Sequence, residues 1–360
     1  MREDNQTYYD SPEFKEILQS FEDMIDNERA IYFDGSDIAD IADYYTMNME
    51  LDKSDIASDY GLRLHPNNSE ILIAKANNLL LKGRKEDAKA IAETISDNHN
   101  QEVLYVKGVI ELAYNKIDSA NTFFKNAYSC SNSDYDLLSD IIIQLMENRF
   151  YDQAQEWIDL AFKETGNPDS NFYELQADLY FETKQFSLAI EWYNNMLDKF
   201  PYDTYPWEQL GRIYFESCDY IKAKECYEYI EAIDGENFTA SLMKADCYIN
   251  LHDYQTALEK YSLLLEKNES MASVLSFCCG KCCYYLRDID KALEYLTKAE
   301  DSLDSNDTEN FRIELYTYLA KVYIYNNNEE KALKYIYMGL SLDPENDELD
   351  LLINLTKQNN

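Results

Sequence analysis

The 360-residue sequence contains only 9 glycines and 6 prolines, the two residues that most often interrupt regular structure. This scarcity excludes a loop-rich or all-β fold and favours long helices. Cations are also few, because 32 Lys and Arg residues stand against 69 Asp and Glu residues and leave a formal net charge of −37. A surface this negative repels the phosphates of nucleic acids and anionic lipids, so we expect no nucleic acid and no membrane as a partner.

The acidity has two interpretations. Proteins or peptides with basic segments are the electrostatically favoured partners of such a chain. Alternatively, the charge only keeps an elongated protein in solution. Residues 1–6 contain no apolar segment typical of a secretion signal. The longest uncharged stretch of an expected helix, residues 270–280, is too short to span a bilayer. We therefore expect a cytoplasmic protein with reduced cysteines.

Small residues recur along the chain with a period of 32 to 35 residues, once extended to 40. One series marks the second helix of each expected hairpin: Ser54, Ala88, Ala120, Ala154, Ala189, Ala223, Ala257, Ala292 and Ala332. Another series, of which eight members are Gly or Ala and the ninth is Ile142, precedes it by twelve residues: Ala42, Ala76, Gly108, Ile142, Ala177, Gly211, Ala245, Gly280 and Ala320. Two antiparallel helices approach closely where a small residue at their crossing admits a large one from the partner helix. The large partners expected four residues after the first series include Phe124, Ile158, Tyr193, Tyr227, Tyr261, Leu296 and Ile336.

One unit reads Trp207, Leu210, Gly211 and Tyr214, followed by Ala223. This pattern resembles the signature of the tetratricopeptide-repeat family, whose repeats have about 34 residues. The resemblance implies an all-α fold, a right-handed superhelical α-solenoid of about nine helix-turn-helix repeats. The expected repeats are residues 35–68, 69–100, 101–134, 135–169, 170–203, 204–237, 238–272, 273–312 and 313–344.

Both ends of the array are expected to carry capping helices, because a terminal repeat would otherwise expose its core. Residues 1–34 combine a disordered start, residues 1–10, with a helix that has Ser11 as N-cap and Pro12 in its first turn. Residues 345–360 form the closing helix, whose apolar residues are Leu349, Leu352, Ile353 and Leu355.

Nothing in the sequence predicts catalysis. The three histidines, at positions 65, 99 and 252, share no expected site with a nucleophile, and no nucleotide-binding motif occurs. The cluster Cys278, Cys279, Cys282 and Cys283 has two interpretations. A metal or redox site is one; the other is structural, because Cys279 and Cys283 fall on core positions of a helix. We favour the structural one and expect no enzyme, no metal and no cofactor.

In the tetratricopeptide-repeat family the first helix of each repeat lines the concave, partner-binding face. The positions implied by the resemblance in the fourth to sixth repeats are mostly acidic: Asp136, Asp140, Glu147, Glu174, Asp178, Glu182, Glu208, Arg212 and Glu216. In the last two repeats they hold Phe277, Lys281, Tyr284, Tyr285, Tyr318, Lys321 and Tyr325. These rings anchor a peptide or pack against the neighbouring hairpin, and both interpretations stay open. The sequence thus predicts a scaffold that binds a protein or peptide, with a peptide-sensing regulator as the alternative.

Overall fold

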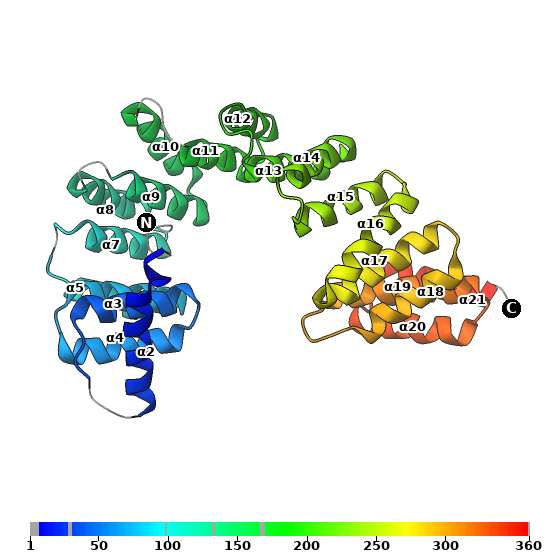
Figure 1. Ribbon diagram of the computed structural model, residues 1–360, viewed down its shortest axis with the longest axis horizontal. Helices are drawn as coiled ribbons and strands as arrows, with labels where there is room; N and C mark the ends of the chain where they lie inside the picture. Colours follow the sequence, from blue (N-terminus) through cyan, green and yellow to red (C-terminus); the bar gives the residue numbers. More distant parts are fainter. Residues whose placement is uncertain (1–6, 28–30, 98, 132–133, 166–169, 359–360) are drawn as a thin grey trace. The chain divides into compact units, whose positions relative to one another are not determined.

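The computed structural model describes residues 7–27, 31–97, 99–131, 134–165 and 170–358 (Figure 1). Over these residues the chain is helical and has no β-strand. The helices are α2 (Pro12–Asp26); the pairs α3 (Gly35–Met47) and α4 (Leu51–Leu64), α5 (Ser69–Leu81) and α6 (Lys85–Thr94), α7 (Gln101–Ala113) and α8 (Ile117–Cys130), α9 (Tyr135–Glu147) and α10 (Tyr151–Thr165), α11 (Ser170–Glu182) and α12 (Phe186–Lys199), α13 (Thr204–Glu216) and α14 (Tyr220–Ile233), α15 (Phe238–Asn250) and α16 (Tyr254–Lys267), α17 (Ala272–Tyr285) and α18 (Ile289–Asp301), α19 (Glu309–Tyr325) and α20 (Glu329–Leu342); and α21 (Asp347–Gln358). The expected all-α class is confirmed, whereas the exact number of repeats and the handedness of a superhelix stay predictions.

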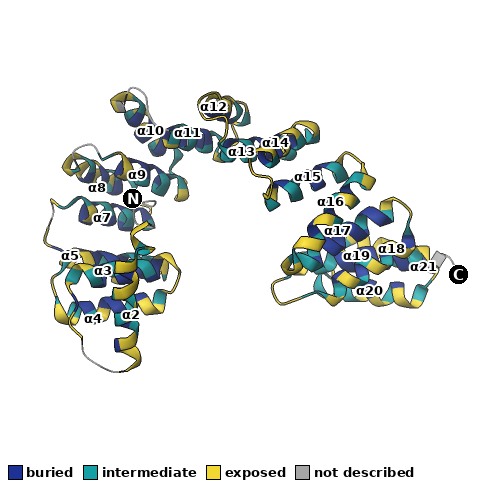
Figure 2. Ribbon diagram, viewed as in Figure 1, coloured by how far each residue is buried: buried dark blue, intermediate teal, exposed yellow. Residues whose placement is uncertain are grey.

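The chain divides into two compact units, residues 1–192 and 193–360. In the first unit α3, α5, α7 and α9 each pack against the second helix of their own pair and against the first helix of the next pair, so that α3, α5, α7, α9 and α11 lie side by side. In the second unit α17 packs in the same way against α18 and α19, and α19 against α20 and α21. Buried residues lie where the helices meet, and exposed residues face away (Figure 2).

Small residues set the close approach of paired helices, as the sequence predicts. A Cβ atom on Gly108 would lie 2.5 Å from the ring of Phe124, and one on Gly280 would lie 2.7 Å from Leu296. Ala120 and Ala292, the small residues on the second helices of these pairs, are fully buried. The helix axes can therefore approach closely only because no larger side chain stands at either crossing.

The turn between the two helices of each pair contains a residue in the left-handed region, which sequence analysis does not identify. These residues recur with the same period as the small ones: Met49, Gly83, Asn115, Arg149, Lys184, Cys218, His252, Arg287 and Asn327. Only Gly83 adopts this conformation without steric cost. The left-handed conformation recurs in every pair although the residue type changes, so it does not depend on one particular residue at this position.

The N-terminal cap forms as predicted, because the Ser11 hydroxyl accepts a hydrogen bond of 3.2 Å from the backbone NH of Phe14 and Pro12 opens α2. Residues 1–6 of the predicted disordered start lie outside the described residues. Residues 7–9 are helical, contrary to that prediction. The cause is packing: the Tyr9 ring lies 4.8 Å from that of Phe14 and 5.6 Å from that of Tyr44.

The closing helix α21 covers the last pair with only part of its apolar surface. Leu349 is fully buried and would contact a Cβ added to Gly339 of α20, and Leu352 is also buried. Leu355, the last of the four apolar residues named from the sequence, is half exposed.

Candidate functional site

The structure brings the predicted acidic positions of the fourth and fifth pairs together on neighbouring helices. They are divided between α9, with Asp136, Asp140 and Glu147, and α11, with Glu174, Asp178 and Glu182, and these two helices pack against each other. Some are exposed and others, such as Asp140 and Asp178, are half-buried. Both degrees of exposure leave the carboxylates within reach of solvent.

The remaining predicted residues of this group lie on α13 in the second unit. Glu208 is half-buried, whereas Arg212 and Glu216 are exposed. The Arg212 guanidinium donates a hydrogen bond of 2.8 Å to the side-chain oxygen of Gln209 on the same helix.

Further carboxylates, not included in the sequence prediction, extend the acidic positions to the first three pairs. Asp40 and Asp43 lie on α3, Glu70 on α5 and Glu102 on α7. They occupy the same positions of the first helix as the predicted residues, so the same count applied to the first three repeats would have found them. We call the carboxylates on α3, α5, α7, α9 and α11 the acidic face: Asp40, Asp43, Glu70, Glu102, Asp136, Asp140, Glu147, Glu174, Asp178 and Glu182.

Carboxylates from different helices of the acidic face influence one another. Burial and then the charges of Asp40 and Glu102 raise the pKa of Asp43 to about 7. Burial and the charge of Glu70 raise the pKa of Glu102. Burial likewise raises the pKa of Asp40, against a hydrogen bond from Tyr8 that lowers it. Like charges thus converge here from α3, α5 and α7, which disfavours the fully ionised form.

The aromatic positions of the last two first helices form a packed cluster in the second unit. Phe277 and Tyr318 are buried, with exposed fractions of 4% and 6%, and their ring centroids lie 5.5 Å apart. Packing therefore accounts for these two rings. Tyr284 is half-buried, and Tyr285 and Tyr325 are exposed.

Two lysines join the aromatic cluster. Lys281 forms an ion pair of 3.0 Å with Glu314, and Lys321 one of 2.6 Å with Glu348. The Lys321 ammonium also lies 4.4 Å from the ring centroid of Tyr318. On the exposed side, Tyr285 stacks on Tyr254 at 4.6 Å. The cluster thus presents tyrosines to solvent around cations that are already paired.

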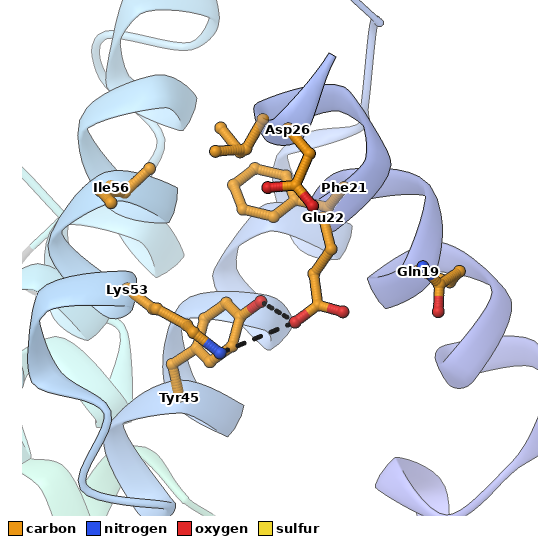
Figure 3. Close-up of a pocket in the computed structure, with 8 residues that line it drawn as sticks. Gln19, Phe21, Glu22, Asp26, Tyr45, Lys53 and Ile56 are labelled. Atoms are coloured by element: carbon orange, nitrogen blue, oxygen red, sulfur yellow. Dashed lines mark hydrogen bonds and ion pairs between the residues drawn. The ribbon is translucent and has the colours of Figure 1, made fainter. Parts of the chain in front are cut away.

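A hollow of about 410 Å³ opens between α2, α3 and α4 in the first unit (Figure 3). Its apolar lining comprises Phe21, Ile25, Ile56 and the Tyr45 ring, and its polar lining comprises Gln19, Glu22, Asp26 and Lys53. The sequence does not predict this hollow, because its walls are a cap helix and a second helix, whereas the expected binding positions lie on first helices.

The four clustered cysteines lie on α17, and burial is what most of them share. Cys279, Cys282 and Cys283 are fully buried, and Cys278 is half-buried. Burial raises the pKa of the Cys279 thiol to about 12 and that of Cys283 to about 11. Burial thus favours the protonated form of both thiols over the thiolate, the nucleophilic form.

Two features are absent from the part of the chain that the structure describes. No three His, Cys, Asp or Glu side chains gather there in a group able to hold a metal ion. No helix there combines the length and the apolar character needed to cross a bilayer.

Comparison with known proteins supports one family. Residues 141–204 match the family model described as tetratricopeptide repeat. The solved C-terminal part of a TPR repeat-containing protein from Cytophaga hutchinsonii is similar to this chain, with a TM-score of 0.55 and 18% identity, over 68% of this chain and 97% of that one. This likeness shows that the fold is that of a tetratricopeptide-repeat solenoid.

Two curated proteins are similar over shorter stretches. Human cilia- and flagella-associated protein 70 is 26% identical over 178 residues, 48% of this chain. Superkiller protein 3 of Schizosaccharomyces pombe is 30% identical over 128 residues, 35% of this chain. The matched stretches span only 15% and 9% of those two proteins.

Proposed function

We propose that this chain, a tetratricopeptide-repeat protein, is a non-enzymatic scaffold that holds a partner protein or peptide with basic segments against its first helices. Tetratricopeptide repeats commonly mediate protein–protein interaction, and stacked helix pairs offer an extended surface for it. A reducing compartment such as the cytoplasm suits the chain, because all eight of its cysteines are free.

The proposal that the partner is basic rests on the convergence of carboxylates on the acidic face. Asp43 of α3 and Glu102 of α7 lie close enough for the charge of one to raise the pKa of the other. Such repulsion costs stability in the free protein, and a partner cation that neutralises it would recover that cost on binding. A charge that served only solubility would need no such convergence.

Residues of the second unit supply a separate set of proposed contacts. Glu208, Arg212 and Glu216 on α13 offer mixed charge, and the exposed rings of Tyr285 and Tyr325 offer aromatic anchors. Tyr284 and Tyr318 contact the ring of Tyr285 and would hold it in place. Phe277, Lys281 and Lys321 in turn lie against Tyr318.

The test uses a fluorescent peptide of alternating lysine and glycine, titrated into the full chain at two salt concentrations. We expect Asp43→Asn with Glu70→Gln and Glu102→Gln to weaken binding at least tenfold and to reduce its salt dependence, because three charges near the peptide are lost.

A matched control neutralises three exposed carboxylates on second helices, Glu86→Gln, Asp118→Asn and Glu156→Gln. Its net charge equals that of the first variant, but its substitutions lie on α6, α8 and α10. Equal loss of affinity in the two variants would show that only net charge attracts the peptide, and the proposed role of the acidic face would then be abandoned.

A further inference from the structure

The hollow between α2 and α4 exposes apolar surface. Ile25 of α2 is 40% exposed and Ile56 of α4 is 47% exposed, and both line the hollow. Its floor is firm, because Phe21 is only 2% exposed and packs against Phe33 and Tyr60 at ring distances of 5.8 Å and 6.0 Å. Two isoleucines facing one hollow above a fixed aromatic floor are suited to receive apolar side chains.

Charge around the hollow is arranged unevenly. Glu22 accepts a hydrogen bond of 3.1 Å from the Tyr45 hydroxyl and lies 3.8 Å from the Lys53 ammonium (Figure 3). Lys53 is held more closely by Glu50, at 2.5 Å, and lies over the Tyr45 ring. Asp26 completes the lining on α2. Lys53 is thus already paired with Glu22 and Glu50, whereas Glu22 and Asp26 make the α2 side of the lining negative.

Ile56 also lines a neighbouring hollow, whose charged residues are Asp59, Arg63 and Lys75. Lys75 forms an ion pair with Asp59. Arg63 of α4 therefore adds positive charge to the second hollow, whereas Glu22 and Asp26 of α2 make the first one negative, so a bound segment that covered both would meet opposite charges at its two ends. A partner with its cations at one end is thereby oriented with that end toward α2.

We infer that the hollow between α2 and α4 is a second docking site, for an amphipathic helix of a partner protein with two apolar side chains one turn apart and lysine or arginine beside them. The apolar side chains would contact Ile25, Ile56 and Phe21, and the cations would contact Glu22 and Asp26. The site is separate from the acidic face, because it is built on the cap helix and a second helix. It therefore goes beyond the proposed function and does not depend on it.

The probe is a labelled 14-residue helical peptide with two leucines four residues apart and three flanking lysines, titrated by fluorescence anisotropy. We expect Ile25→Ser with Ile56→Ser to raise the Kd at least tenfold and Asp26→Asn to raise it about threefold. Both isoleucines are partly exposed, so these substitutions leave the core intact, and circular dichroism verifies the helix content. Ile221→Ser, at an isoleucine of α14 that is 58% exposed, is the matched control and should leave the Kd unchanged.

Two altered peptides separate the contribution of the apolar contacts to binding from that of the charges. Replacing both leucines by serine, or the three lysines by glutamate, should each abolish binding to the wild-type chain. Equal binding of the serine peptide, or a Kd within twofold of wild type for the double isoleucine variant, would overturn the site. If the acidic-face variant loses the peptide while the double isoleucine variant retains it, the peptide binds the first helices and the inference fails while the proposed function stands. If instead the double isoleucine variant loses the peptide while the acidic-face variant retains it, the peptide binds in the hollow and the inference is supported.

Discussion

Two tyrosines at equivalent positions of successive helix pairs should respond in opposite ways to loss of their hydroxyl groups. Tyr261 of α16 is fully buried, and its hydroxyl donates to the Asp246 carboxylate on α15. Tyr227 of α14 is equally buried, but its hydroxyl has no hydrogen-bond partner among the described residues. The residue that precedes Tyr227 by the same 15 positions is Arg212, which cannot accept a hydrogen bond.

The expected changes in the free energy of unfolding follow from the surroundings of the two hydroxyl groups. Tyr261→Phe removes a charge-assisted hydrogen bond and leaves Asp246, whose pKa burial already raises, without that donor. We expect the free energy of unfolding to fall by about 1.5–3 kcal/mol. Tyr227→Phe removes a buried hydroxyl that makes no bond and keeps the ring that fills the space above Gly211. The free energy of unfolding should stay unchanged or rise by up to about 2 kcal/mol.

Urea unfolding followed by circular dichroism gives both values, and native-state hydrogen exchange localises each effect to α13–α14 or α15–α16. Arg212→Asp supplies the acceptor that Tyr227 lacks, and in that background Tyr227→Phe should become destabilising. If both substitutions destabilise the wild-type chain by similar amounts, the hydroxyl of Tyr227 is bonded in solution and the reasoning fails.

Four further predictions concern the packing, the turns and the charge. Gly211→Val places a larger side chain against Tyr227 and should lower the free energy of unfolding by about 1–3 kcal/mol or more, measured by urea titration. Arg149→Gly removes the steric cost of a left-handed residue and should raise the free energy of unfolding by about 1 kcal/mol, whereas Gly83→Ala should lower it by a similar amount. A change in the same direction for both variants would contradict the left-handed conformation of these turns. Burial raises the pKa of Asp43 from its ordinary value of 3.8 to about 7, so the folded state binds the proton more tightly and stability should fall as pH rises from about 4 to 7. Asp43→Asn should remove that slope and stabilise the chain at pH 8 by about 1.4 kcal/mol for each unit by which folding raises the pKa. Melting temperature should rise as ionic strength approaches about 0.15 M, where the Debye length is about 8 Å, and a constant value would show that self-repulsion is negligible.

The sequence predicted the helical pairs because their packing depends on residue size at a fixed spacing. Gly108 against Phe124 and Gly280 against Leu296 are contacts between positions already paired by period alone. The sequence could not show which of two interpretations held for Phe277 and Tyr318, because burial of a ring depends on the neighbouring helix pair. In the structure Phe277 contacts both Tyr318 and Phe311, so packing is the interpretation that holds for these two rings.

The hollow lined by Ile25 and Ile56 could not be predicted for a different reason. It depends on how the cap helix α2 is set against α4, and no periodic position of the sequence describes that contact. The helical turn at residues 7–9 was missed for the same reason, since the aromatic contacts of Tyr9 come from Tyr44 on α3 as well as from α2. Residues that pack outside the repeat lattice escape an analysis based on period.

The lateral contacts in the first unit run from one first helix to the next, α3 to α5 to α7 to α9 to α11. Such an arrangement is modular along its length, because each hairpin depends directly only on its two neighbours. Removing one whole hairpin, for example residues 69–100, would therefore shorten the row of carboxylates by one register while allowing the flanking hairpins to join. Duplication or deletion of one hairpin in the gene would thus lengthen or shorten the acidic face by one hairpin, and the new neighbours would meet through the same kind of contact.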